Sequence, residues 1–242
     1  MREYLQFLGR GSAFTDENNS AFFTAGDELV LIDLPMSSFR RLRRYGADTL
    51  SGSRDPGITV LVTHTHGDHT GGIPTFIHYA FYILHRKVTV IAPSEEVAGD
   101  LRFLAERLEG CRPEAYELIT AKDANRPWLL DVIPTRHSPE LEGRCFGYRL
   151  RVNGKDVIYT GDTAEIEPFL PYLGKGSLLY SDCSAHKSGV HINVSELLEK
   201  TRGLGIQLYL MHLDDPEKIM RAAEGSGAEI APLYDRDRNE EA

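Results

Sequence analysis

A ten-residue stretch, THTHGDHTGG at residues 63–72, limits most strongly what this chain can fold into. It places three histidines and one aspartate within residues 64–69 and ends in two glycines. Without a cation, four such side chains in one tight loop would repel one another or make no useful contact. Imidazole nitrogens and a carboxylate can instead converge on a metal ion. The stretch therefore predicts a metal-binding loop, and its glycines permit the backbone angles of a sharp turn.

The residues around this loop predict a layered fold of strands and helices. Apolar runs suited to sheet strands lie at residues 4–8, 21–24, 28–33, 58–63, 88–92, 129–134, 145–152, 156–160, 177–181 and 207–211. Helical patterns lie at residues 73–84, 94–108, 193–203 and 216–223. Because the strands gather in two runs with helices between and after them, we expect two packed sheets with helices outside. The sequence shows no internal repeat or linker.

Three residues farther along the chain could complete the metal site that the loop begins. His137 and Asp162 each follow a predicted strand, Asp162 within the segment TGDT, and His212 ends an apolar run. A capped turn aspartate or a buried core histidine is the alternative at each position taken singly. Asp33 also ends a predicted strand, where it could orient a ligand histidine through its second ring nitrogen or serve as a plain turn residue.

The order of these features resembles the metallo-β-lactamase superfamily: THTHGDHTGG, a lone histidine, TGDT, and a histidine that ends a strand. The resemblance covers nearly the whole chain. It implies an α/β (α+β) fold, a four-layer αββα sandwich with two metal ions at one edge of the sheets, formed by a single hydrolase domain over residues 1–242. It also implies that one metal is held by His64, His66 and His137 and the other by Asp68, His69 and His212, with Asp162 bridging.

Three further stretches are similar to ribonuclease Z-like phosphodiesterases. They are FLGRGSAF followed by NS within residues 7–20, Gly-Tyr-Arg at residues 147–149 soon after His137, and HINVSELL, which begins at His191. In that group the histidine at the position of His191 assists phosphodiester cleavage. The chain departs from ribonuclease Z in being short for the flexible arm that grips transfer RNA, and its net charge is −9. A small or cyclic phosphodiester is therefore expected in preference to a structured RNA.

These features predict a metal-dependent hydrolase, with phosphodiester cleavage as the favoured activity. Zinc is the favoured metal, with manganese, iron or nickel as alternatives. We expect two ions to share a bridging hydroxide that attacks the phosphorus. Asp68 and His191 are the predicted catalytic residues, and His191 would donate a proton to the leaving oxygen or a hydrogen bond to a phosphoryl oxygen. His191 as a surface loop histidine is the alternative, and for nearby His186 a solvated position is favoured over substrate contact.

Other functions on the same residues stay open. A thioesterase or lactonase of the glyoxalase II type could use the same H-x-H-x-D-H loop, and a ribonuclease Z-type RNA endonuclease is a less favoured alternative. A β-lactamase is disfavoured because those enzymes lack a bridging aspartate at the position of Asp162. A di-iron oxidoreductase would be expected to carry glutamate in place of His66. A metal-stabilised binding module would not need the full set of ligands.

Charge and composition bear on the compartment and the partners. The net charge of −9 argues against a broad phosphate-binding surface, so no DNA partner is expected, and the arginine-rich segment 39–44 is interpreted as the solvated face of a short helix. The three cysteines form no CxxC pair, no apolar stretch approaches the roughly 20 residues of a membrane helix, and the N-terminus does not look like a secretory signal. These features favour a cytoplasmic protein with an anionic small-molecule substrate and no membrane partner. A homodimer is suggested only by relatives, and the final DRDRNEEA is expected to fray.

Overall fold

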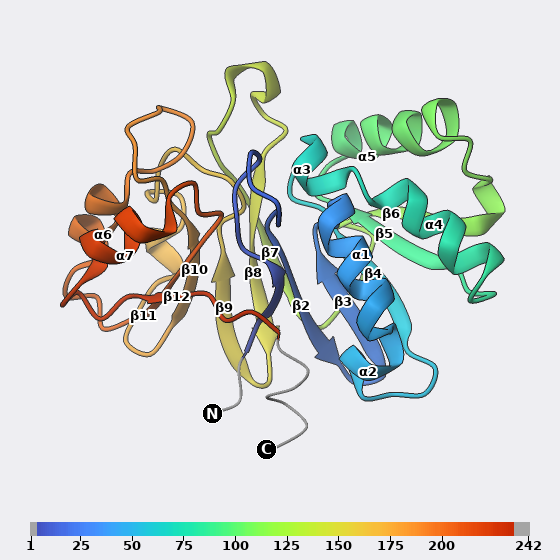
Figure 1. Ribbon diagram of the computed structural model, residues 1–242, viewed down its shortest axis with the longest axis horizontal. Helices are drawn as coiled ribbons and strands as arrows, with labels where there is room; N and C mark the ends of the chain where they lie inside the picture. The colour runs from blue at the N-terminus through green and yellow to red at the C-terminus, as the bar shows by residue number, and fades with distance from the viewer. Residues whose placement is uncertain (1–3, 235–242) are drawn as a thin grey trace.

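The computed structural model describes residues 4–234, which form two six-stranded sheets packed face to face with helices on both outer surfaces (Figure 1). The strand order is β1-β2-β3-β4-β5-β6 in the first sheet and β12-β11-β10-β9-β8-β7 in the second. The four-layer αββα sandwich predicted from the sequence is therefore confirmed. The expectation for DRDRNEEA falls on residues 235–242, which lie outside the described residues.

Every predicted strand is present, with ends shifted by at most two residues. The first sheet consists of β1 Gln6–Gly9, β2 Ser20–Ala25, β3 Glu28–Ile32, β4 Gly57–Leu61, β5 Val88–Ala92 and β6 Tyr116–Thr120. The second consists of β7 Leu129–Pro134, β8 Phe146–Val152, β9 Lys155–Tyr159, β10 Leu178–Asp182, β11 Gln207–Met211 and β12 Glu229–Ile230. The strands β6 and β12 were not predicted: both are edge strands, and β12 has two residues, too few for a periodic pattern.

The two sheets repeat one pairing pattern, although no repeat is visible in the sequence. In the first sheet, β1, β2 and β3 pair antiparallel and β3 to β6 pair parallel. In the second, β7, β8 and β9 pair antiparallel and β9 to β12 pair parallel. Parallel strands end at a common edge of their sheet. The residues that follow β3, β4, β9, β10 and β11 therefore lie at the carboxyl ends of the parallel strands.

Helices on the outer faces complete the four layers (Figure 1). Those on the first sheet are α1 Met36–Tyr45, α2 Ala47–Ser51, α4 Ile73–Tyr82 and α5 Glu95–Arg102, and a π-helical segment, Phe103–Leu108, continues α5. Those on the second are α6 Val194–Thr201 and α7 Pro216–Ala223, while the short α3 Gly67–Thr70 lies within the predicted metal loop. In α1, Phe39 and Leu42 are buried while Arg40, Arg43 and Arg44 are exposed, as predicted for a helix with a solvated basic face.

Three apolar clusters fill the spaces between the layers. The central cluster joins the two sheets through residues such as Phe7, Val30, Tyr148 and Tyr180. The outer clusters lie under the helices on either side, and their members include Phe76 of α4 and Leu197 of α6. Cys111, Cys145 and Cys183 are buried and unpaired, as expected for small apolar core residues. None of the helices in the described part of the chain has the length and apolar character needed to cross a membrane.

The packing predicts a large difference between two phenylalanines on neighbouring helical segments. Phe76 is 1% exposed and Phe103 is 57% exposed. Replacing Phe76 with Ala leaves a cavity under the first sheet and should lower the free energy of unfolding by about 3–5 kcal/mol. The matched change Phe103→Ala should cost less than about 1 kcal/mol. Chemical denaturation of both variants at one metal concentration measures the difference, and equal losses would contradict this assignment of the core.

Candidate metal centre

The histidine loop is held in place by Asp33, which is fully buried just after β3. Its carboxylate accepts hydrogen bonds from Thr63 N (2.8 Å) and Thr63 Oγ1 (2.8 Å), and Oδ2 also lies 2.8 Å from His69 Nδ1. Burial raises the pKa of Asp33, and the bonds from His69 and Thr63 offset part of that rise. Of the two roles that the sequence left open for Asp33, the contact with a ligand-type histidine is the one present. The bond between Asp33 and His69 Nδ1 leaves the other ring nitrogen of His69, Nε2, directed toward the site.

A first group of ligand-type atoms joins the two sheets. His64 and His66 follow β4 of the first sheet, and His137 follows β7 of the second. His66 Nδ1 lies 3.0 Å from His64 Nε2 and 3.3 Å from His137 Nε2. His137 Nδ1 donates to the carbonyl of Val190 at 2.7 Å, which leaves Nε2 directed at the other two rings. All three side chains could hold one metal ion between them.

A second group lies beside the first and also spans both sheets. It contains Asp68 and His69 from the loop, Asp162 after β9, and His212 after β11. Asp68 Oδ2 lies 3.4 Å from both His69 Nε2 and His212 Nε2. Asp162 Oδ2 lies 3.4 Å from His69 Nε2 and 3.3 Å from His212 Nε2. The structure thus brings together all seven of the residues predicted as metal ligands.

The spacing of these atoms fits a bound cation better than a hydrogen-bonded network. Two ligand atoms that bind zinc tetrahedrally at about 2.0–2.1 Å lie about 3.3–3.4 Å apart, whereas hydrogen bonds bring such atoms to about 2.7–3.0 Å. Most of the separations within the two groups are 3.3–3.4 Å. His69 Nε2 and Asp162 Oδ1, two buried atoms of the cluster, have no hydrogen-bond partner among residues 4–234. A set of imidazole nitrogens and carboxylate oxygens is also what zinc and related divalent ions prefer.

The pKa shifts show how strongly the carboxylates attract positive charge to this place. Burial and the neighbouring His69 hold the pKa of His64 well below its usual value. Burial would also lower the pKa of His212, but Asp162 and the other nearby carboxylates outweigh it and raise that pKa to about 10. For His69, burial is likewise outweighed by Asp162 and Asp33, which hold its pKa well above the usual range. Carboxylates that raise the pKa of two buried rings favour positive charge at this place and would also stabilise metal cations.

The backbone adopts unusual angles where it delivers these side chains. Asp33 and His212 have φ values of 58° and 55°, in the left-handed region that costs non-glycine residues about 1–3 kcal/mol. Gly161 has φ +60°, and a Cβ there would lie 2.5 Å from Phe146 O and 3.2 Å from Thr63 Cβ. The residue before Asp162 must therefore be glycine, because the turn that follows β9 passes directly against the histidine loop.

Sequence reasoning missed Asp182, the last residue of β10. Asp182 is fully buried, and its Oδ2 lies 2.7 Å from His191 Nδ1 and accepts from Thr163 N at 2.9 Å. Burial would lower the pKa of His191, but Asp182 outweighs it and raises that pKa. His191 lies at the edge of the cluster, where its Nδ1 is 4.0 Å from Asp162 Oδ2. No local signal marks Asp182, because its partner lies nine residues away across a loop.

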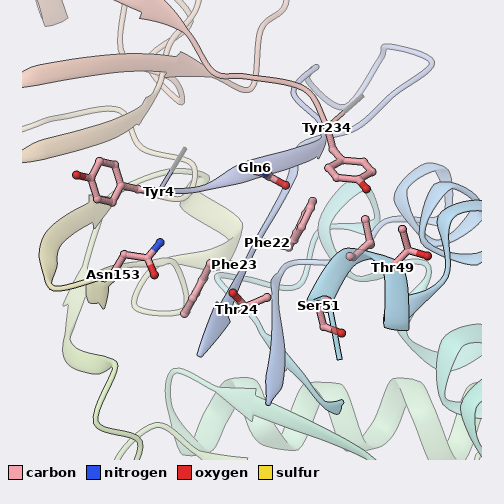
Figure 2. A pocket seen from close by; sticks show the side chains of 11 residues that line it. Tyr4, Gln6, Phe22, Phe23, Thr24, Thr49, Ser51, Asn153 and Tyr234 are labelled. Carbon is pink, nitrogen blue, oxygen red and sulfur yellow. The ribbon is translucent and has the colours of Figure 1, made fainter. Parts of the chain in front are cut away.

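Two other features lie apart from this cluster. His186 is exposed and belongs to none of the ligand groups found among residues 4–234, in line with the solvated position favoured from the sequence. A cavity of about 440 Å³ is lined by side chains that include Tyr4, Phe22 and Asn153 (Figure 2). Asn153 precedes β9 and α2 precedes β4, so this cavity lies at the opposite strand ends from the metal-type residues. None of the predicted site residues lines it.

Solved structures of known proteins share this fold. The metallo-β-lactamase fold protein YhfI from Bacillus subtilis matches with a TM-score of 0.72 at 18% identity, over 93% of this chain and 94% of that protein. A diphosphatase from the PhnP family matches with a TM-score of 0.69 at 18% identity, over 95% and 94%. The short form of human tRNase Z matches with a TM-score of 0.62 at 16% identity, over 88% and 93%. At these identities the likeness shows the fold, and the metallo-β-lactamase fold that the sequence led us to expect is confirmed.

Sequence comparisons identify a family within this fold. The Anti-Pycsar protein Apyc1 of Bacillus phage 010DV004 is 28% identical, with 87% of this chain and 89% of that protein covered. The Apyc1 of Paenibacillus sp. (strain J14) is 26% identical, with 92% and 94% covered. The family model described as Anti-Pycsar protein Apyc1 matches residues 3–229. This chain, which presents a cluster of buried histidines and aspartates where its two sheets meet, belongs to the Anti-Pycsar protein Apyc1 family.

Proposed function

We propose that this chain is a dinuclear-metal hydrolase that cleaves a small or cyclic phosphodiester, with zinc as the favoured metal. The observation that carries the proposal is the pair of ligand groups on either side of Asp162, with separations that suit tetrahedral metal binding. Two divalent cations held there would supply Lewis acidity that activates water and stabilises negative charge on phosphoryl oxygens. Asp68 contributes to catalysis in this proposal by helping to hold the second cation.

His191 is proposed to donate a proton to the leaving oxygen. Its Nδ1 is paired with Asp182 at 2.7 Å, so Nε2 is the ring nitrogen left for substrate. Its side chain is 22% exposed, whereas the ring of His212 beside it is 1% exposed. Asp182 is a positioning residue, because it is buried and orients the ring of His191, and its Oδ1 also lies 3.5 Å from His212 Nδ1.

The acidic character of the chain supports a small substrate. A net charge of −9 would repel a polyanion approaching over a broad surface, whereas a single phosphodiester needs positive charge only where it reacts. Two proteins of the same fold are named as a diphosphatase and a tRNase Z, which supports chemistry at phosphorus. A thioesterase or lactonase on the same residues is the alternative that a substrate panel must exclude.

We also propose that the chain works as one domain. Each ligand group takes residues from both sheets: His64 and His66 with His137 in one, and the loop residues with Asp162 and His212 in the other. Neither sheet with its helices could complete a metal site alone. The central apolar cluster joins the same two sheets below the site.

Removing a ligand should reduce the metal content. Because His64 contributes to the first group only, His64→Ala should lower bound zinc from about two ions per chain toward one. Elemental analysis after gel filtration in metal-free buffer measures the ratio. His186→Ala, which changes an exposed histidine outside the cluster, is the matched control and should retain both ions. A His64→Ala protein with unchanged metal content would contradict the ligand assignment.

Replacing His191 should separate catalysis from metal binding. We expect His191→Ala to keep its metal content and to lose about 10²–10⁴-fold in kcat on a substrate with an alkoxide leaving group. The loss should be much smaller with p-nitrophenolate, which leaves without needing a proton. Asp182→Asn should lower kcat in the same leaving-group-dependent way with little change in KM. Equal losses on both kinds of substrate would exclude the role of proton donor.

A panel of substrates tests the reaction class. Protein reconstituted with zinc should hydrolyse bis(p-nitrophenyl) phosphate and a cyclic nucleotide faster than a lactone or a glutathione thioester. The reason is that two cations held by the ligand groups would place positive charge beside the substrate, which matches the negative charge that phosphoryl oxygens carry. Turnover dominated by the thioester or the lactone would replace the phosphodiesterase proposal with the glyoxalase II-like alternative.

A further inference from the structure

We infer that a cleft beside His137 receives the leaving-side part of the substrate, and that Glu142 and Glu165 exclude a second phosphate from it. The cleft has a volume of about 390 Å³ and is lined by residues 134–139 together with Glu142, Gly143, Glu165 and Gly189. This volume lies within the range of small-molecule pockets, about 300–1,000 Å³. The inference rests on the proposed phosphodiesterase function and names the kind of substrate that the same site accepts.

The walls of the cleft are continuous with the metal centre. His137 lines both, Glu165 lies three residues after Asp162, and Gly189 lies two residues before His191. The three segments are joined by hydrogen bonds of 2.7 Å to main-chain carbonyls: His137 Nδ1 to Val190 O, Ala164 N to Arg136 O, and Ile192 N to Thr163 O. The cleft is therefore held at a fixed place relative to the reacting atoms.

The position of His191 shows which part of the substrate enters. Ligand-type atoms of His137, Asp162 and His191 lie within 4.8 Å of one another. His191 is the proposed proton donor to the leaving oxygen, and the loop that carries it also forms a wall of the cleft through Gly189. The group attached to the leaving oxygen must therefore extend along this wall. Pro134, Pro139 and the two glycines give the cleft small or apolar surfaces that suit an uncharged organic group.

The charged lining residues oppose an additional anion. Arg136 pairs with Glu165 at 3.3 Å, so its charge is largely committed to that carboxylate. Glu142 is exposed and makes no ion pair with any residue in the 4–234 range. The lining thus carries one net negative charge, from Arg136, Glu142 and Glu165. A leaving strand of RNA or DNA would bring its next phosphate toward these carboxylates, and like charges at such range repel.

A matched set of three substrates tests the inference. They are thymidylyl-thymidine and the same dinucleotide with a terminal phosphate at its 5′ or its 3′ end. One of the two phosphorylated forms carries its extra phosphate on the leaving nucleoside. The measured quantity is kcat/KM for the unphosphorylated substrate divided by kcat/KM for that form. We expect a ratio of about ten for the wild-type protein, because the repulsion acts only on the added charge. Glu142→Gln/Glu165→Gln leaves Arg136 as the charged residue of the lining, so the ratio should fall below one.

Further variants keep the outcome decisive. Glu142→Lys changes one exposed side chain that has no ion pair to lose, so it should fold normally and invert the preference. Glu199→Gln/Glu229→Gln removes two exposed carboxylates outside the cleft and should leave the ratio at about ten. If the wild-type protein cleaved none of the three substrates, nor bis(p-nitrophenyl) phosphate, nor a cyclic nucleotide, the proposed function would fail, and the cleft assignment with it. If it cleaved a cyclic nucleotide but none of the three dinucleotides, the cleft assignment alone would be overturned. If it cleaved them and the ratio stayed the same in Glu142→Gln/Glu165→Gln and Glu142→Lys, only the cleft assignment would be overturned.

Discussion

The structure depends on the carboxylate of Asp162, which lies where the two sheets meet and is surrounded by imidazole rings. Its Oδ2 is 3.3–4.0 Å from ring nitrogens of five histidines: His64, His69, His137, His191 and His212. Burying an uncompensated carboxylate is costly, so the rings are required for stability as well as for chemistry. Because the histidines come from four separate loops, their convergence on one oxygen ties the ends of both sheets together.

The same electrostatic balance explains the residues behind the rings. Asp33 supports His69 and Asp182 supports His191, and both of these carboxylates are fully buried. Each accepts a backbone N–H as well as contacting an imidazole: Thr63 N at Asp33 and Thr163 N at Asp182. Asp33 lies just beyond β3, which pairs in parallel with β4, and Asp182 ends β10, which pairs in parallel with β9. Each sheet thus supplies one acid behind the site.

The sequence predicted most of the cluster because its signals are local. THTHGDHTGG concentrates four ligand-type residues in one turn, and His137, Asp162 and His212 each follow a strand that is visible as an apolar run. Asp182 could not be found in this way. Its role arises from the parallel pairing that sets it beside Met211, next to His212, and from the return of the following loop to β10 through the bridge between Ser184 and Asn193. Register between distant strands is a tertiary property that one sequence does not display.

The cleft beside His137 was unpredictable for a related reason, and it shows how selectivity can be separated from chemistry in this fold. Its walls are parts of three loops that are far apart in the sequence, and only packing reveals that they line one space. The bonds that fix these loops involve main-chain atoms, including Val190 O, Arg136 O and Thr163 O. Side chains such as Glu142 and Glu165 can therefore change without displacing the histidine that the same loops hold. A family member could alter which leaving group it accepts while the metal-type residues keep their positions.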